Sequence, residues 1–234
     1  MRYFHSLALI FFITTAGFSQ EQKRMNFGVK TGVVISSFWG NGIDNFEKAL
    51  SEQLQNFDPD MLLSLTVAGL ISYEFIPGFF NIQGELQYLR LGKNWELDLP
   101  DGEKISFGLS TDYLSVPVLF KLLIPINKSV LPEVYAGPSF FIQLHSRAKN
   151  LSVVPQDAQR GFLKELGTNQ NVSKQISNFD IGFQTGLNIN FPIKRGTVVL
   201  DLRFGFGSID TFNSDKAEDI RNSSFSIMVG YLFR

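Results

Sequence analysis

Apolar and polar side chains alternate along residues 179–191. The odd-numbered positions carry six large apolar side chains, with Thr185 as the one exception: Phe179, Ile181, Phe183, Leu187, Ile189 and Phe191. The even-numbered positions carry only Asp, Gly, Gln and Asn. A pleated strand places alternate residues on one face, whereas a helix would spread these apolar side chains around its circumference. The segment is therefore predicted to be a strand with one apolar and one polar face.

The same alternation recurs in seven other segments, and this repetition is a stronger signal than any single strand. They cover residues 27–35, 65–75, 80–88, 114–122, 134–142, 198–206 and 225–233. The connections alternate between long ones, at 39–63, 93–110, 146–178 and 208–221, and short ones with Pro or Gly, at 76–78, 125–128 and 192–196. Such alternation is typical of up-and-down membrane barrels, whose tight turns face the periplasm. We predict an all-β fold, an eight-stranded antiparallel up-and-down transmembrane β-barrel of OmpA/OmpX-like architecture.

The polar face of these strands holds charged residues of both signs. Whether this face points outward or into the lumen distinguishes a water-soluble barrel from a membrane barrel. In a water-soluble barrel or sandwich the charges would face water and the phenylalanines would fill the core, while in a membrane barrel the faces are inverted. Strand length and the N-terminal segment described next favour the membrane barrel. We then expect a charge network inside the lumen, with acids paired to Lys121 and Arg203 across adjacent strands. Its members are Lys30, Glu85, Lys121, Glu133, Asp180, Asp201 and Arg203.

The N-terminus has the features of a secretory signal peptide. Arg2 precedes an apolar run at residues 7–13, and the small residues Gly17 and Ser19 stand before Gln20. A membrane-anchoring helix needs about 20 apolar residues, and this run is shorter. We expect a signal peptide at residues 1–19 and a barrel domain at residues 20–234, exported to the cell outer membrane.

The amino-acid composition argues against several other kinds of site and partner. The chain has 234 residues, a net charge of -1 and no cysteine. Without cysteine there is no disulfide, no thiolate metal site and no lipidation cysteine, and the near-zero charge gives no argument for nucleic acid as a partner. No cofactor and no metal site are expected.

Catalysis would need a base near a nucleophile. His145 is the single histidine outside the predicted signal peptide, and Ser139 and Ser146 are the nearest hydroxyl groups along the strand. No serine lies in a nucleophile motif, and no carboxylate is placed by the sequence to orient the imidazole. We therefore expect no enzyme and no catalytic residues.

The long loops contain two candidate helices. In residues 45–57, Phe46, Leu50 and Leu54 recur at helical spacing among charged side chains, and residues 156–166 suggest a second helix. Either helix could bind a partner, but we expect a lid over the mouth of the barrel.

Several segments, in order along the chain, resemble the PorT-type outer-membrane β-barrel family of Bacteroidetes. They read FGVKTGV from Phe27, GELQY from Gly84, YLSVPVLFK from Tyr113, YAGPS from Tyr135, DIGFQTGL from Asp180, and VGYLFR at the C-terminus. The resemblance implies an outer-membrane barrel and little about its activity. The aromatic C-terminal strand resembles those read by the barrel-assembly machinery.

From this pattern we expect a non-enzymatic structural or adaptor component of the cell envelope or of a secretion-associated complex. Its partners would be outer-membrane lipid, the barrel-assembly machinery and possible envelope proteins, with no nucleic acid. The alternatives are a small-ligand or lipid-binding barrel and, third, a lipid-modifying enzyme.

Overall fold

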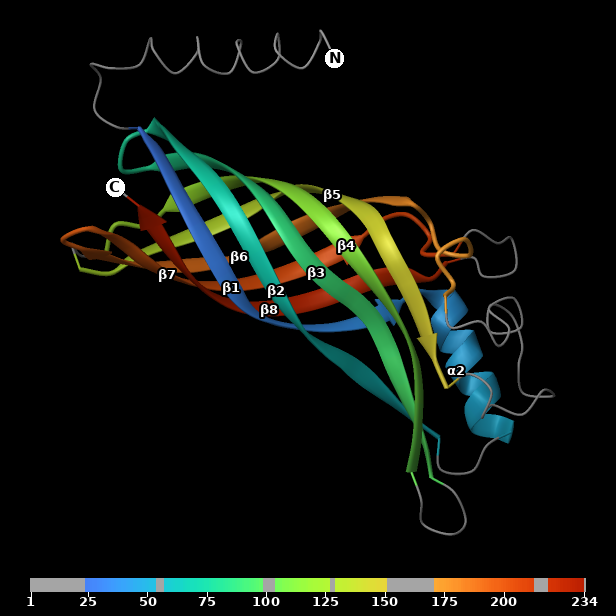
Figure 1. Ribbon diagram of the computed structural model, residues 1–234. Coiled ribbons are helices and arrows are strands. Elements are labelled where there is room, and N and C mark those ends of the chain that lie inside the picture. The colour runs from blue at the N-terminus through green and yellow to red at the C-terminus, as the bar shows by residue number, and fades with distance from the viewer. Residues whose placement is uncertain are drawn as a thin grey trace, which may run out of the picture.

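Eight antiparallel strands close into a barrel in the computed structural model of the chain, which describes residues 24–53, 57–98, 104–126, 129–150, 171–212 and 219–233 (Figure 1). Each strand pairs with the next, and the last pairs with the first. The strands are β1 (Met25–Trp39), β2 (Phe57–Ile76), β3 (Phe80–Asp98), β4 (Lys104–Leu123), β5 (Leu131–Lys149), β6 (Phe179–Ile193), β7 (Gly196–Gly207) and β8 (Arg221–Phe233). The predicted fold class is confirmed, with every predicted strand present in the predicted order.

The closing seam joins β1 to β8 from Phe27↔Phe233 to Trp39↔Arg221. Because the ladder closes on itself, no strand is left with an unpaired edge along the body of the barrel. One end carries the short connections between β2 and β3, β4 and β5, and β6 and β7, and we call it the turn end. The other carries α2 (Asn41–Gln53), and we call it the loop end (Figure 1).

Two predicted loops are wrong in whole or in part, since residues 57–63 of the connection predicted at 39–63 already belong to β2. Residues 93–110 were expected to connect two strands, but β3 and β4 continue through this region and pair as far as Asp98↔Lys104. The hydrophobic pattern reverses there: Trp95, Phe107 and Leu109 point inward and are buried, while polar Asn94 and Ser110 lie on the outside. A search for strands with apolar side chains on the outside does not detect this continuation.

The first predicted helix is confirmed in kind and shifted in position. The structure has α2 at Asn41–Gln53, whereas residues 45–57 were predicted, and Phe57 already begins β2. Ile43, Phe46 and Leu50 bury one face of α2 against the loop end of the barrel. The second predicted helix, at 156–166, and the predicted signal peptide, at 1–19, lie outside the described residues.

Asp219, in the connection to β8, holds the start of α2. Its carboxylate Oδ2 accepts a hydrogen bond from the Asn41 amide at 2.8 Å, and its carbonyl oxygen accepts one from the Gly42 amide at 3.2 Å. A carboxylate at this position satisfies a free amide and complements the helix dipole. Gly40 precedes the helix with φ 116°, and a Cβ there would lie 2.1 Å from the Asp219 carbonyl oxygen. The approach therefore requires glycine.

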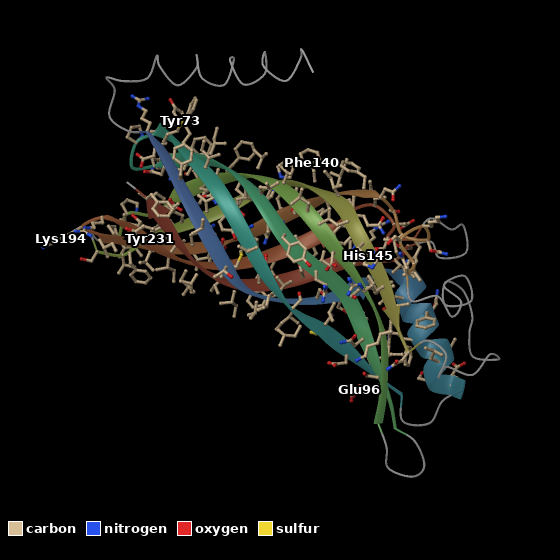
Figure 2. All side chains as sticks on the ribbon, viewed as in Figure 1. Tyr73, Glu96, Phe140, His145, Lys194 and Tyr231 are labelled. Carbon is tan, nitrogen blue, oxygen red and sulfur yellow. The ribbon has the colours of Figure 1, made fainter. Side chains whose placement is uncertain are left out.

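The wall of the barrel has an apolar outside and a polar inside through most of its length. On β6, Phe183 is 48% exposed and its neighbour Gln184 is 3% exposed. Figure 2 shows Phe140 and Tyr73 directed away from the barrel, as are many other apolar side chains. Within the described residues, no helix is both long and apolar enough to cross a bilayer. An apolar exterior around a polar interior needs an apolar environment outside the wall.

Candidate functional site: the filled lumen and its lid

Four charged side chains meet in the middle of the lumen, and we call them the central cluster: Lys30 of β1, Glu85 of β3, and Asp201 and Arg203 of β7. Lys30 Nζ lies 3.2 Å from Glu85 Oε1 and 2.7 Å from Asp201 Oδ2. Arg203 binds Glu85 through two parallel contacts, at 2.7 and 2.8 Å, and Asp201 at 2.7 Å. All four residues are buried, and their formal charges cancel.

Uncharged groups satisfy much of the remaining hydrogen-bonding capacity of the central cluster. The Tyr135 hydroxyl donates to Asp201 Oδ1 and accepts from Arg203 Nε at 3.0 Å. Gln184 Oε1 accepts a hydrogen bond from Arg203 Nη1, also at 3.0 Å. Buried charges are costly unless they are paired and hydrogen-bonded, so this arrangement is stable only as a connected set.

The pairing differs from the predicted one in a specific way. Charges were expected to pair between adjacent strands, but Lys30 and Arg203 reach Glu85 across the lumen from β1 and β7. In an eight-stranded barrel the interior is only wide enough for side chains, so long side chains from opposite walls meet. Lys121 instead pairs with Glu133 of the adjacent strand β5, one of the acids expected to pair with it, and lies apart from the central cluster.

That second pair lies toward the turn end. Lys121 Nζ is 2.7 Å from Glu133 Oε2, and it also donates to Gln83 Oε1 at 3.0 Å. Asn81 Nδ2 donates to the other oxygen of Glu133 at 3.0 Å. A cavity of about 150 Å³ adjoins the pair and is lined by polar side chains that include Asn26, Glu74, Asn81 and Asn190. The interior therefore has room for water at this end.

Asp180 is buried but does not join either group. Its Oδ1 accepts hydrogen bonds from the backbone amides of Ser208 and Ile209, at 3.3 and 2.9 Å. These contacts anchor the connection that follows β7. Of the seven residues in the expected network, the structure thus places four in the central cluster and two in the Lys121–Glu133 pair, with Asp180 apart from both.

The lumen is closed by apolar side chains between the central cluster and the loop end. Val34, Leu89, Leu91, Tyr113 and Phe141 form one buried layer. Above it, side chains of α2 join those of the strand ends and connections in a larger cluster, which we call the lid core: Phe38, Ile43, Phe46, Leu50, Trp95, Phe107, Leu109, Ala148, Val172, Ile176, Phe212 and Ile220. Together the two layers seal this end of the barrel with apolar packing.

A polar contact holds α2 in place, and sequence reasoning missed it. Glu47 Oε1 accepts a hydrogen bond from Trp95 Nε1 at 2.9 Å and lies 2.5 Å from Lys93 Nζ. Glu47 stands one turn from Ile43 on the buried side of the helix, where a charge is unexpected. A charged residue on the apolar side of a predicted helix is a sequence signal that could have indicated a buried partner for Glu47.

The candidate catalytic residues do not form a catalytic arrangement. Ser146 points inward and donates to Thr111 Oγ1 at 2.9 Å, while Ser139 is buried against Ser115 and Gln184. His145 is half-buried near the loop end (Figure 2), and its imidazole forms no hydrogen bond or ion pair with the described residues. In the described part of the chain, no three His, Cys, Asp or Glu side chains gather as metal ligands.

A closed antiparallel barrel with an apolar wall and a paired polar interior defines the class of transmembrane β-barrels. The chain belongs to the family of outer membrane protein beta-barrel domains, whose family model matches residues 18–213. The protein is therefore an outer-membrane barrel, and by the rule for such barrels its turn end faces the periplasm and its loop end the exterior.

Several solved structures are similar to this chain at low identity. Ail, the attachment invasion locus protein of Yersinia pestis, solved in complex with the heparin analogue sucrose octasulfate, shares 13% identity with a TM-score of 0.42, covering 90% of this chain and 99% of Ail. The outer membrane protein OprG of Pseudomonas aeruginosa shares 11%, with a TM-score of 0.42 and coverage of 89% and 96%. Neisserial surface protein A shares 12%, with a TM-score of 0.44 and coverage of 88% and 96%. No curated protein matches the chain.

Proposed function

We propose that this protein is a non-enzymatic structural or adaptor component of the cell envelope, or of a secretion-associated complex. The observation that carries the proposal is the filled lumen. The central cluster bridges opposite walls, and the lid core closes the exterior end above it. A barrel packed in this way offers surfaces to other molecules rather than a path through its centre.

The secretion-associated part of the proposal comes from the resemblance to the PorT-type family of Bacteroidetes, whose name is that of a secretion-associated member. The most specific segments of this resemblance, residues 113–121 and 135–138, lie on the adjacent strands β4 and β5. They contribute Lys121 and Tyr135, whose polar groups point into the lumen and join the two charge groups there. These segments thus support the interior packing of the barrel. Partners would bind elsewhere, at the turns or at the lid.

Two further parts of the proposal concern the ends of the chain. Residues 1–19 act as a signal peptide that is removed, which leaves residues 20–234 as the barrel domain. The C-terminal strand β8, with Tyr231 and Phe233 on its outer face, is recognised by the barrel-assembly machinery. N-terminal sequencing of the protein purified from outer membranes tests the first part and should begin at Gln20.

Conductance in planar bilayers tests the closed lumen. The purified protein should show no steady channel current, because the central cluster blocks the lumen from wall to wall. Cross-linking in intact cells, with identification of the captured proteins, should recover envelope components. A steady porin-like current would overturn the proposal and favour a transport function.

Catalysis on lipid is not proposed. The carboxylate opposite His145 in the ladder is Asp112, which already binds Arg90 Nε at 2.6 Å and the Tyr88 hydroxyl at 2.9 Å. The imidazole therefore lacks the orienting partner that a general base needs. The remaining alternative, a lipid-binding barrel, has a specific surface in its favour.

A further inference from the structure

A groove of about 560 Å³ lies on the outer wall of the barrel, where β2, β3, β4 and β5 approach the exterior end. Its lining includes Leu63 and Leu65 of β2, Arg90 of β3, Gly108 and Ser110 of β4, and Lys149 of β5. The groove is on the outer face of the wall. It does not touch the central cluster, and Leu109 is the one residue that it shares with the lid core.

One side of the groove is apolar. Leu63 and Leu65 are 66% and 72% exposed, and they continue the apolar outer row of β2 beyond Val67. On the neighbouring strand β3, the corresponding apolar row ends at Tyr88 and is followed by Arg90. The leucines therefore extend the apolar surface of β2, which an acyl chain could contact, to the height on the barrel at which polar side chains begin on β3.

The other side of the groove is basic. Lys149 and Arg147 of β5 are both exposed and lie opposite Gly108 and Ser110 in the ladder. Arg90 adds a third cation, whose side chain remains 40% exposed although it is paired with Asp112. In the part of the chain that the structure describes, neither Lys149 nor Arg147 forms an ion pair. On this side of the groove, three cations thus face one carboxylate, whereas the acids Asp60 and Glu96 lie beside Asn94 on β2 and β3.

The floor between these two sides is low. Gly108 and Ser110 are small, and a Cβ at Gly108 would lie 2.4 Å from Asn94 Oδ1 and 2.9 Å from the Lys93 carbonyl oxygen. A larger side chain at residue 108 would have to displace a neighbour in the ladder. The small floor keeps the space between the leucines and Lys149 open.

We propose that this groove binds a lipid of the outer leaflet whose headgroup carries phosphate. An acyl chain lies along Leu63 and Leu65, and the phosphate lies between Lys149, Arg147 and the exposed part of Arg90. Cations at the edge of an apolar surface attract anionic headgroups, and guanidinium groups match phosphate oxygens in geometry. A soluble anion would leave the leucines without an apolar contact, and an uncharged lipid would leave the cations without an anionic partner. This inference concerns the outer wall, so it stands or falls separately from the closed lumen.

Native mass spectrometry of the folded barrel tests the proposal, with phosphorylated lipid A and its dephosphorylated form as probes. The unaltered protein should retain one phosphorylated lipid and prefer it about ten-fold or more, given the attraction typical of each basic residue at an anionic surface. The double variant Arg147→Gln/Lys149→Gln should lose this preference. The matched control is Lys194→Gln/Arg195→Gln, which removes the same charge from the exposed turn between β6 and β7 at the periplasmic end, and it should keep the preference.

Further outcomes separate the sources of binding. Leu63→Ser/Leu65→Ser should weaken retention of the phosphorylated lipid, and inorganic phosphate should fail to displace that lipid from the unaltered protein. Faster migration of unboiled than of boiled samples on detergent gels verifies that each variant is folded. Equal retention of the two lipids by the unaltered protein would overturn the proposal without reference to any variant. An equal loss in the control variant, or displacement by inorganic phosphate, would overturn it as well.

Discussion

The membrane-level part of the wall and its exterior continuation use the same strands with opposite polarity. Along β3, Glu85 and Gln87 point into the lumen while Leu86 faces outward; a few residues later, Leu91 and Trp95 point inward while Asn94 faces outward. The backbone ladder between β3 and β4 runs through both parts. The difference shows that the surroundings of each part, lipid or water, determine which parity is apolar.

The two parts are consequently stabilised in different ways. At membrane level, lipid outside the wall gives no hydrophobic gain for an apolar interior, and the lumen is held by the paired charges of the central cluster. In the exterior continuation, water surrounds the wall, so the lid core packs as in a soluble protein. The substitutions that follow each change one of these two parts.

The largest effect is expected from Arg203→Met. This change leaves Glu85 and Asp201 with Lys30 as their one remaining cation in the central cluster. Removing one partner of a buried charged set costs about 3 to 5 kcal/mol. The free energy of unfolding of the barrel in lipid vesicles measures the loss, and Arg195→Met at the exposed turn between β6 and β7 is the control. Equal unfolding free energies for the two variants would contradict the role of the central cluster.

The second-largest loss of unfolding free energy is expected from Leu86→Lys, and its control is Asn94→Lys, also on the outward face of β3. Lysine at Leu86, which is 56% exposed to lipid, should cost about 2 to 4 kcal/mol. Lysine at Asn94 faces water and should change stability by less than about 0.5 kcal/mol. The same measurement in vesicles separates the two. Similar losses of unfolding free energy in the two variants would contradict the conclusion that the surroundings of β3 change from lipid to water between Leu86 and Asn94.

Phe183→Lys should behave like Leu86→Lys, because Phe183 also faces lipid. Gln184→Lys, its neighbour on the lumen side, is a poor control because Gln184 accepts a hydrogen bond from Arg203. A lysine at residue 184 would face that guanidinium with like charge. The comparison along β3 avoids this difficulty.

The smallest effect is expected from Glu47→Gln in the lid. The amide can still accept from Trp95 Nε1, but the ion pair with Lys93 is lost, which should cost about 1 kcal/mol. The loss should be local: hydrogen exchange should rise in α2 while the body of the barrel keeps its protection. Glu52→Gln, on the exposed side of α2, is the matched control. Faster exchange throughout the strands would show that lid and barrel unfold as one unit.

The sequence was sufficient to predict the faces of the wall and insufficient to predict the contacts inside it. Glu85 and Arg203 were assigned to the lumen because each alternates with apolar neighbours, a local pattern. Their pairing across the lumen depends on how far the strands are staggered around the barrel, which no local pattern contains. For the same reason Lys30 could not be identified as the residue that links β3 to β7.

The lid was also predicted only in part. Phe46 and Leu50 predicted a helix over the mouth of the barrel, since their spacing is helical. The strand continuation beneath it was missed because Trp95 and Phe107 follow the pattern of a soluble protein. A search for a change of parity within each strand, rather than for one fixed parity, would have extended β3 and β4 to their observed ends.

The hydrogen bonds between Asp219 and the first turn of α2 have a consequence for the order of assembly. They join Asn41, close to the first strand, to a residue that directly precedes the last strand. Until the last strand has joined the first, the helix lacks the group that completes its first turn. A seated lid is thus a sign, readable from outside the cell, that the final strand has joined the first.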